Sequence, residues 1–136
     1  YGVSKAYIFI GLIPKHKDLY TRLQECGFTL IFKEVTYDGA GKPKGNCDAD
    51  LVLQAARDCY EDNFGGAILV ASDGDYSGLV KFLMDRGKFS AVISPASPQK
   101  CSILLKRTNA KIAYINDQRE MLEYKNKRAP DGDGTP

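Results

Sequence analysis

Three aspartates have the side-chain type and the spacing along the chain that could hold a divalent cation. Asp73 and Asp75 are separated by one glycine, and Asp48 precedes them. Carboxylates that crowd together repel each other and raise their own pKa values unless a cation compensates. Oxygen ligands without His or Cys nearby favour Mg²⁺ or Mn²⁺. We therefore expect Asp48, Asp73 and Asp75 to bind one of these ions if the fold brings them together.

Asp73 and Asp75 lie at a predicted strand-to-helix turn. The apolar run 67–70 predicts a buried strand before them, and the apolar spacing in 78–86 predicts a helix after them. In an open α/β sheet, ligands bind in the crevice beyond the carboxyl ends of the strands. Asp75 also has a simpler interpretation, as the N-cap of that helix.

Asp48 lies at the N-cap or in the first turn of a predicted helix over 48–60. The loop before it follows the carboxyl end of a predicted strand over 28–35, so Asp48 should share a sheet edge with Asp73. Asp50 lies about 200° around the helix from Asp48. We expect the negative charge of Asp50 to stabilise the N-terminus of the helix rather than to bind the ion.

Strands and helices alternate along the chain, which predicts an α/β fold with a parallel sheet, helices on both faces and right-handed crossovers. The segment 37–46 has three glycines, one proline and no periodicity, and is predicted as a loop. The predicted strands are 6–13, 28–35, 67–70, 89–93 and 111–115. The predicted helices are 18–26, 48–60, 78–86, one that starts at 95–98 with Cys101, Leu104 and Leu105 on its core face, and 117–125.

The composition is that of one ordinary globular domain. The residues are 43% hydrophobic and 26% charged, and no apolar run approaches the roughly 20 residues that a membrane helix needs. The cysteines form no C-x-x-C pair and His16 is the only histidine, so a zinc site is not supported. We expect free thiols in a reducing cytoplasm, no membrane association, a domain over 1–127 and a disordered tail over 128–136.

The segment 100–128 is basic, with eight Lys or Arg residues against three acids, a net charge of +5. A basic segment beside an acidic cluster would suit a polyanion held next to metal ions. Solvated helix faces would give the same pattern.

The stretch Lys44-Gly-Asn-Cys-Asp48, followed some twenty residues later by Ser72-Asp73-Gly-Asp75, resembles the paired signature of the NYN domains, the LabA-like branch of the PIN-like nucleases. The resemblance extends over most of the chain. It implies a three-layer α/β/α, Rossmann-like PIN-type fold and a metal-dependent ribonuclease whose acidic residues hold Mg²⁺ or Mn²⁺. The acidic positions correspond to Asp48, Asp73 and Asp75, and Lys44 corresponds to the Lys-Gly lead-in.

One element of this resemblance is missing. Members of the family usually open with a further strand that ends in an Asp, whereas the strand over 7–13 corresponds to their second strand and 11–14 offers no carboxylate. We expect either that this sequence is a fragment or that the site lacks one ligand, which would impair activity. The missing strand would be central, so its loss should expose edges that favour a homo-oligomer.

The resemblance implies hydrolysis of RNA phosphodiesters, with Asp48 and Asp73 as direct metal ligands and Asp75 as a ligand or an acceptor that orients the attacking water. Lys44 is the candidate phosphate contact, with an ordinary loop lysine as the alternative, and Ser72 takes the place of a small residue in the family. Tyr37 and Tyr76 are candidates to stack on bases, although packing is the more common role of a tyrosine beside a sheet edge. One alternative is a module that binds RNA or a protein partner without catalysis. Another is a toprim-like phosphotransfer enzyme, which would require a separate glutamate after an earlier strand. Glu34, the available one, lies inside a predicted strand.

Overall fold

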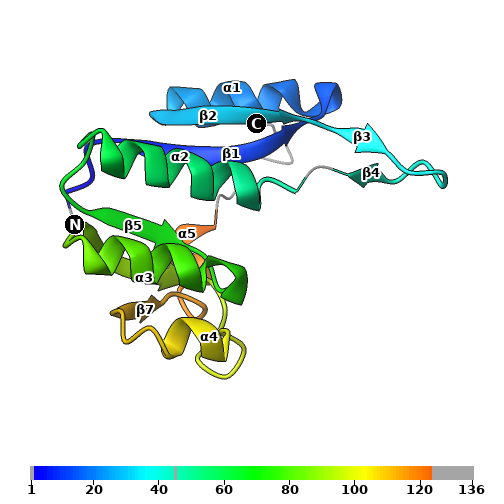
Figure 1. Cartoon of the computed structure of the whole chain (residues 1–136). Helices are drawn as coiled ribbons and strands as arrows, with labels where there is room; N and C mark the ends of the chain where they lie inside the picture. The colour runs from blue at the N-terminus through cyan, green and yellow to red at the C-terminus, as the bar shows by residue number, and fades with distance from the viewer. Residues whose placement is uncertain (1, 45, 124–136) are drawn as a thin grey trace. The chain divides into compact units, whose positions relative to one another are not determined.

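A computed structural model describes residues 2–44 and 46–123 of the chain, which divides into two compact units, Tyr1–Gly65 and Gly66–Pro136 (Figure 1). The predicted disordered tail, 128–136, and the end of the helix predicted over 117–125 lie outside the described residues.

The first unit is built on a parallel pair of strands. β1 and β2 run in register, with Phe9 opposite Ile31. In chain order the elements of this unit are β1 (Ala6–Leu12), the 3₁₀ turn η1 (Pro14–His16), α1 (Lys17–Glu25), β2 (Phe28–Glu34), β3 (Thr36–Tyr37), β4 (Pro43–Lys44) and α2 (Asp48–Tyr60).

Helices cover both faces of the β1–β2 sheet, as predicted, with α1 on one side and α2 on the other (Figure 1). On the α1 side, the Tyr20 hydroxyl donates to the Gly11 carbonyl at 2.9 Å, and the Tyr20 ring packs edge-on against Phe32 at 5.0 Å. The near-continuous apolar run over 6–13 predicts a strand buried on both faces, and this prediction is wrong, since Tyr7 is 37% exposed. Within the described residues of this unit, β1 pairs only with β2.

The segment predicted as a loop over 37–46 is in part a hairpin. β3 pairs antiparallel with β4, with Thr36 opposite Lys44. The Asp38 carboxylate closes the turn, because its Oδ1 accepts the N–H groups of Ala40 and Lys42 at 2.9 Å each. Strands of two residues are too short to show a periodicity, so the sequence pattern could not reveal them.

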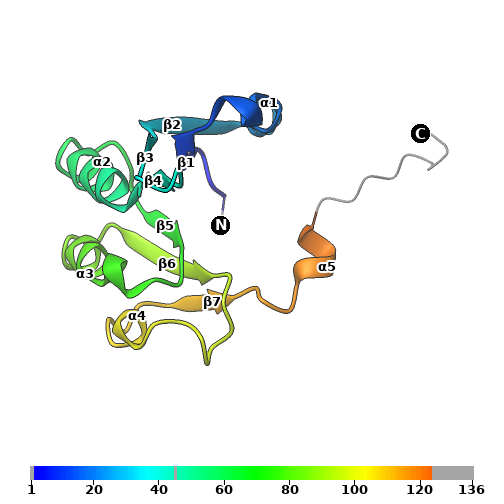
Figure 2. The same ribbon diagram turned by 90° about the vertical axis from the view of Figure 1, so that its right-hand side faces the viewer.

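The second unit has a parallel sheet in the order β5-β6-β7. The middle strand, β6, is the most buried, and its Ala91 and Val92 are inaccessible, as is Val80 of α3. Figure 2 shows α3 and α4 on the same side of this sheet. The elements are β5 (Ala67–Val70), the 3₁₀ turn η2 (Gly74–Tyr76), α3 (Ser77–Asp85), β6 (Phe89–Ser94), α4 (Ile103–Lys106), β7 (Ile112–Tyr114) and α5 (Arg119–Leu122).

Two predictions for this unit are corrected by the structure. The helix predicted to start at 95–98 begins at Ile103, after Ser102, whose hydroxyl caps it by accepting the Leu104 N–H at 3.1 Å. Residues 94–96 instead form a turn, in which the Ser94 hydroxyl donates to the Ala96 carbonyl and accepts the Ala96 N–H. Its Leu104 is exposed, whereas Leu105 is buried. The strand predicted to be buried, β5, ends at Val70, which is 64% exposed.

Both units are α/β structures, and their longer strands pair in parallel, which confirms the predicted fold class. Throughout residues 2–44 and 46–123, no helix has the length and apolar character needed to span a bilayer.

Candidate functional site

Asp73 and Asp75 lie together just beyond the carboxyl end of β5, as predicted. The Ala71 N–H donates to the Ile93 carbonyl at 3.0 Å, which continues the β5–β6 ladder up to the turn. Asp73 then caps η2, and its Oδ1 accepts the Asp75 N–H at 2.9 Å. Both side chains are exposed. The N-cap interpretation of Asp75 is wrong, since Asp75 lies within η2 and Tyr76 holds the N-cap position of α3.

Gly74, the residue between the two aspartates, lies where a side chain has no room. A Cβ at this position would collide with the Ser102 hydroxyl and would lie 3.0 Å from Leu104 Cδ1. The Ser102 N–H also donates to the Ser72 carbonyl at 3.0 Å. Ser102 and Leu104, at the start of α4, therefore pack against the turn and fix the positions of both carboxylates.

Asp48 is the first residue of α2, in the first unit. Its N–H donates to the Asn46 side-chain oxygen at 2.7 Å, and the residue before it, Cys47, makes no side-chain cap. The partial burial of Cys47 raises the pKa of its thiol, and the negative charge of Asp50 raises it further. The thiol is therefore protonated at neutral pH and is no candidate nucleophile.

Asp50 has a partner of its own, as its Oδ2 lies 3.4 Å from Lys33 Nζ on β2. Both side chains are partly exposed, so the ion pair contributes little to stability. It does turn the Asp50 carboxylate toward the β1–β2 sheet. This ion pair agrees with the prediction that Asp50 is not a metal ligand.

The substrate-binding residues predicted from the sequence differ in exposure. Lys44 ends β4 and is exposed, and its carbonyl accepts the Thr36 hydroxyl at 3.5 Å. Ser72 is half-buried. Tyr76 is only 8% exposed, so its ring offers little surface to a base, whereas Tyr37 is 60% exposed. Of the two tyrosines considered for stacking, Tyr37 is therefore the better placed.

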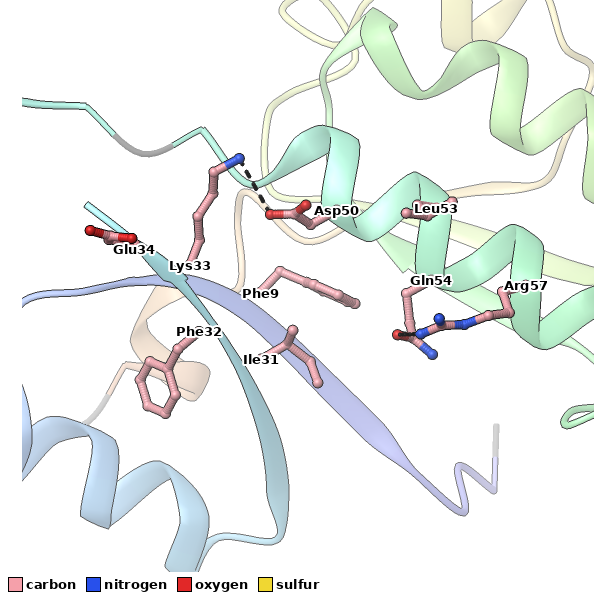
Figure 3. A pocket seen from close by; sticks show the side chains of 9 residues that line it. All are labelled: Phe9, Ile31, Phe32, Lys33, Glu34, Asp50, Leu53, Gln54 and Arg57. Atoms are coloured by element: carbon pink, nitrogen blue, oxygen red, sulfur yellow. Dashed lines mark hydrogen bonds and ion pairs between the residues drawn. The ribbon is translucent and has the colours of Figure 1, made fainter. Parts of the chain in front are cut away.

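A groove that sequence reasoning missed lies between the β1–β2 sheet and α2 (Figure 3). It has a volume of about 480 Å³ and is lined by Phe9, Ile31, Phe32, Lys33, Glu34, Asp50, Leu53, Gln54 and Arg57. The four α2 residues follow the spacing i, i+3, i+4, i+7, which marks one helix face. The sequence itself contains this spacing, so the groove-lining face of α2 could have been recognised from it.

A chain of hydrogen bonds anchors the groove to the interior of the first unit. Arg57 Nη2 donates to Gln54 Oε1 at 2.9 Å, and Gln54 Nε2 donates to Asp58 Oδ1 at 3.0 Å. Asp58 is buried and also accepts the Asn63 amide at 3.2 Å. Since Asp58 fixes the orientation of the Gln54 amide, the amide oxygen is presented to Arg57 and restricts its guanidinium.

Comparison with known proteins gives one family and one solved structure. The model of the NYN domain matches residues 3–116. The crystal structure of a protein of unknown function from Vibrio parahaemolyticus RIMD 2210633 is 26% identical in sequence, with a TM-score of 0.66 over 85% of this chain and 70% of that chain. A comparison with curated proteins found no match.

Proposed function

The chain belongs to the NYN domain family, and we propose that it is a metal-dependent ribonuclease. Membership in this family places the domain in the PIN-like nuclease superfamily. The observation that carries the proposal is the Asp73-Gly74-Asp75 turn, in which two exposed carboxylates are fixed beyond the carboxyl end of β5.

The donor set fits a hard divalent cation. Asp73 and Asp75 offer carboxylate oxygens, and no Lys or Arg among the described residues forms an ion pair with either. Mg²⁺ and Mn²⁺ prefer such oxygen ligands. We propose that Asp48, at the start of α2, joins Asp73 and Asp75 in holding the ion.

The bound ion would lower the pKa of a water molecule and neutralise charge on the leaving oxygen. The water would lose a proton to solvent and its oxygen would attack phosphorus in line, the bond from phosphorus to the leaving ribose oxygen would break, and that oxygen would take up a proton from solvent. Asp75 accepts a hydrogen bond from the attacking water and orients it. Lys44 contacts a phosphate, the half-buried Ser72 lines the site, and Tyr37 stacks on a base in preference to the buried Tyr76.

We place this activity on RNA in a reducing compartment such as the cytoplasm, because all four cysteines are free thiols. A second candidate function has one observation in its favour. The residues that follow β1, 13–16, include no carboxylate. A domain with an incomplete acidic site would bind RNA or a protein partner without cleaving RNA.

Cleavage of a labelled single-stranded RNA tests the proposal. We expect cleavage with Mn²⁺, none with EDTA, and a loss of about 100-fold or more for Asp73→Asn, since a metal ligand is worth several kcal/mol in the transition state. Asp85→Asn, which removes an exposed carboxylate of the same unit at the end of α3, is the matched control and should cleave normally.

Two outcomes would contradict the ribonuclease. Cleavage that survives in Asp73→Asn would point to a contaminating enzyme. RNA binding that is equal in Mn²⁺ and EDTA, with no cleavage in either, would favour the non-catalytic binding module.

A further inference from the structure

We propose that the surface between the β1–β2 sheet and α2 binds single-stranded RNA and holds nucleotides that flank the one being cleaved. This inference rests on the proposed function and assigns a substrate-binding surface to it. The surface is formed by Lys5, Tyr7, Phe9, Lys33 and Arg57, which we call the aromatic strip.

Two neighbouring rings form the centre of the aromatic strip. Tyr7 and Phe9 are two residues apart on β1, so both side chains point to the same face of the sheet. Their ring centroids lie 6.2 Å apart. Figure 3 shows the Phe9 ring directed across the groove toward Gln54 of α2. Aromatic side chains spaced along a strand are the platforms on which unpaired bases stack.

Cations border these rings on both sides. Lys5 Nζ lies 5.2 Å from the Tyr7 ring centroid, Lys33 lies at one end of the groove, and Arg57 lies on α2. Among the described residues that line the groove, the carboxylates are Glu34 and Asp50, and Asp50 pairs with Lys33. The local charge is therefore positive, which favours the phosphates of RNA over an apolar peptide, whose binding would desolvate these cations.

Arg57 is the cation held most firmly. The chain of hydrogen bonds through Gln54 to the buried Asp58 restricts its guanidinium before any ligand arrives. Arginine suits this role, because its planar group offers five N–H donors and only one of them is used by Gln54. The volume of the groove, about 480 Å³, lies within the range of small-ligand sites.

The aromatic strip runs toward the proposed metal ligand of the same unit. Its Lys33 pairs with Asp50, which is two residues beyond Asp48 on α2. The apolar side of the groove is also open to solvent, since Leu53 of α2 is 66% exposed. A strand of RNA lying on Tyr7 and Phe9 would cover this surface and lead its next phosphate to the start of α2.

Binding in EDTA tests the strip without any cleavage. The probe is a fluorescein-labelled, ten-nucleotide single-stranded RNA of mixed sequence, followed by fluorescence anisotropy. We expect Tyr7→Leu and Phe9→Leu each to weaken binding about fivefold or more, because a stacking partner is lost. Phe28→Leu, on the opposite face of β2, is the matched control and should bind like the wild type.

Arg57→Ala should lower the slope of the logarithm of affinity against the logarithm of salt concentration by about 0.7, the value for one phosphate contact with a single strand. Arg107→Ala, an exposed arginine of the second unit, is its control. Thermal unfolding followed by circular dichroism checks that each variant is folded. Tyr7→Leu changes a partly exposed side chain and keeps the test valid if Phe9→Leu unfolds.

The outcomes separate this inference from the ribonuclease. If the variants of the aromatic strip bind RNA like their controls and the chain still cleaves RNA, the strip does not bind RNA, and the ribonuclease proposal is unaffected. If the variants weaken RNA binding and no metal-dependent cleavage is found, the aromatic strip binds RNA, and the ribonuclease proposal is wrong. If sedimentation shows a dimer that Leu53→Glu dissociates and RNA does not, the surface is an interface between copies and the inference is wrong.

Discussion

The aspartates of this chain differ in role because their neighbours differ. Asp50 pairs with Lys33, whereas Asp58 is buried and accepts two amide donors. Asp73 and Asp75 are exposed and have no ion pair with a Lys or Arg in the described part of the chain. A carboxylate that already has a cation or amide partner has less to gain from a metal ion. The pair at 73 and 75 is thus the better candidate for metal binding.

A prediction at the residue scale concerns pH. Partial burial raises the pKa of Tyr114, and the neighbouring Cys101 raises it further. The folded state then holds the phenol proton more tightly than the unfolded state does. This stabilises the fold below the ordinary value of 10.0, and the contribution is lost as the pH rises through the folded-state pKa.

We therefore expect the free energy of unfolding to fall more steeply between about pH 9 and 11 for the wild type than for Tyr114→Phe. Urea titrations at a series of pH values measure it. Tyr37→Phe, which changes an exposed ring, should keep the wild-type slope. Equal slopes for wild type and Tyr114→Phe would contradict the effect of burial.

At the scale of elements, the contact between η2 and α4 determines where Asp73 and Asp75 lie. Gly74→Ala would place a methyl group against the Ser102 hydroxyl and Leu104. We expect a loss of about 1 to 3 kcal/mol in the free energy of unfolding, the usual cost of overpacking. We also expect weaker binding of Mn²⁺, because the turn must shift. Denaturant unfolding and metal titration measure the two effects.

Gly78→Ala is the matched control for this prediction, since a Cβ at Gly78 meets nothing within 4 Å. It lies in α3, where alanine is the better helix former, so the variant should be as stable as the wild type or more stable. A Gly74→Ala variant with normal stability and normal metal affinity would mean that α4 does not position the turn.

At the scale of the whole molecule, the proposed metal site draws on both units, because Asp48 belongs to the first and Asp73 to the second. A ligand that binds only the folded state stabilises it by about 2.7 kcal/mol at a concentration of 100 times its Kd. We expect Mn²⁺ at that concentration to raise the Tm by several degrees in the wild type. Calorimetry should show the rise in Asp85→Asn and its absence in Asp48→Asn and Asp73→Asn.

Comparing the Mn²⁺-induced rise in Tm between Asp48→Asn and Asp73→Asn shows which of the two units binds the ion. If Mn²⁺ still stabilises Asp48→Asn fully, the second unit binds the ion by itself and Asp48 is no ligand. If neither substitution changes the rise in Tm, the acidic residues do not form the site.

Most of the elements, and the local placement of Asp73 and Asp75, can be predicted from the sequence alone. Helix α2 and strand β5 have the predicted bounds, Asp48–Tyr60 and Ala67–Val70. The predictions succeeded there because periodicity and composition over four residues or more report on local backbone preference. The family signature was also visible, since it consists of short local motifs.

The tertiary structure alone decided which side chains meet. It made Asp73 the cap, gave Asp50 the partner Lys33, linked Arg57 through Gln54 to Asp58, and brought α2 over Phe9 to form the groove. It also placed the start of α4 under Gly74. These contacts join segments through strand register and helix packing. A local pattern fixes neither, because each depends on residues far apart in the chain.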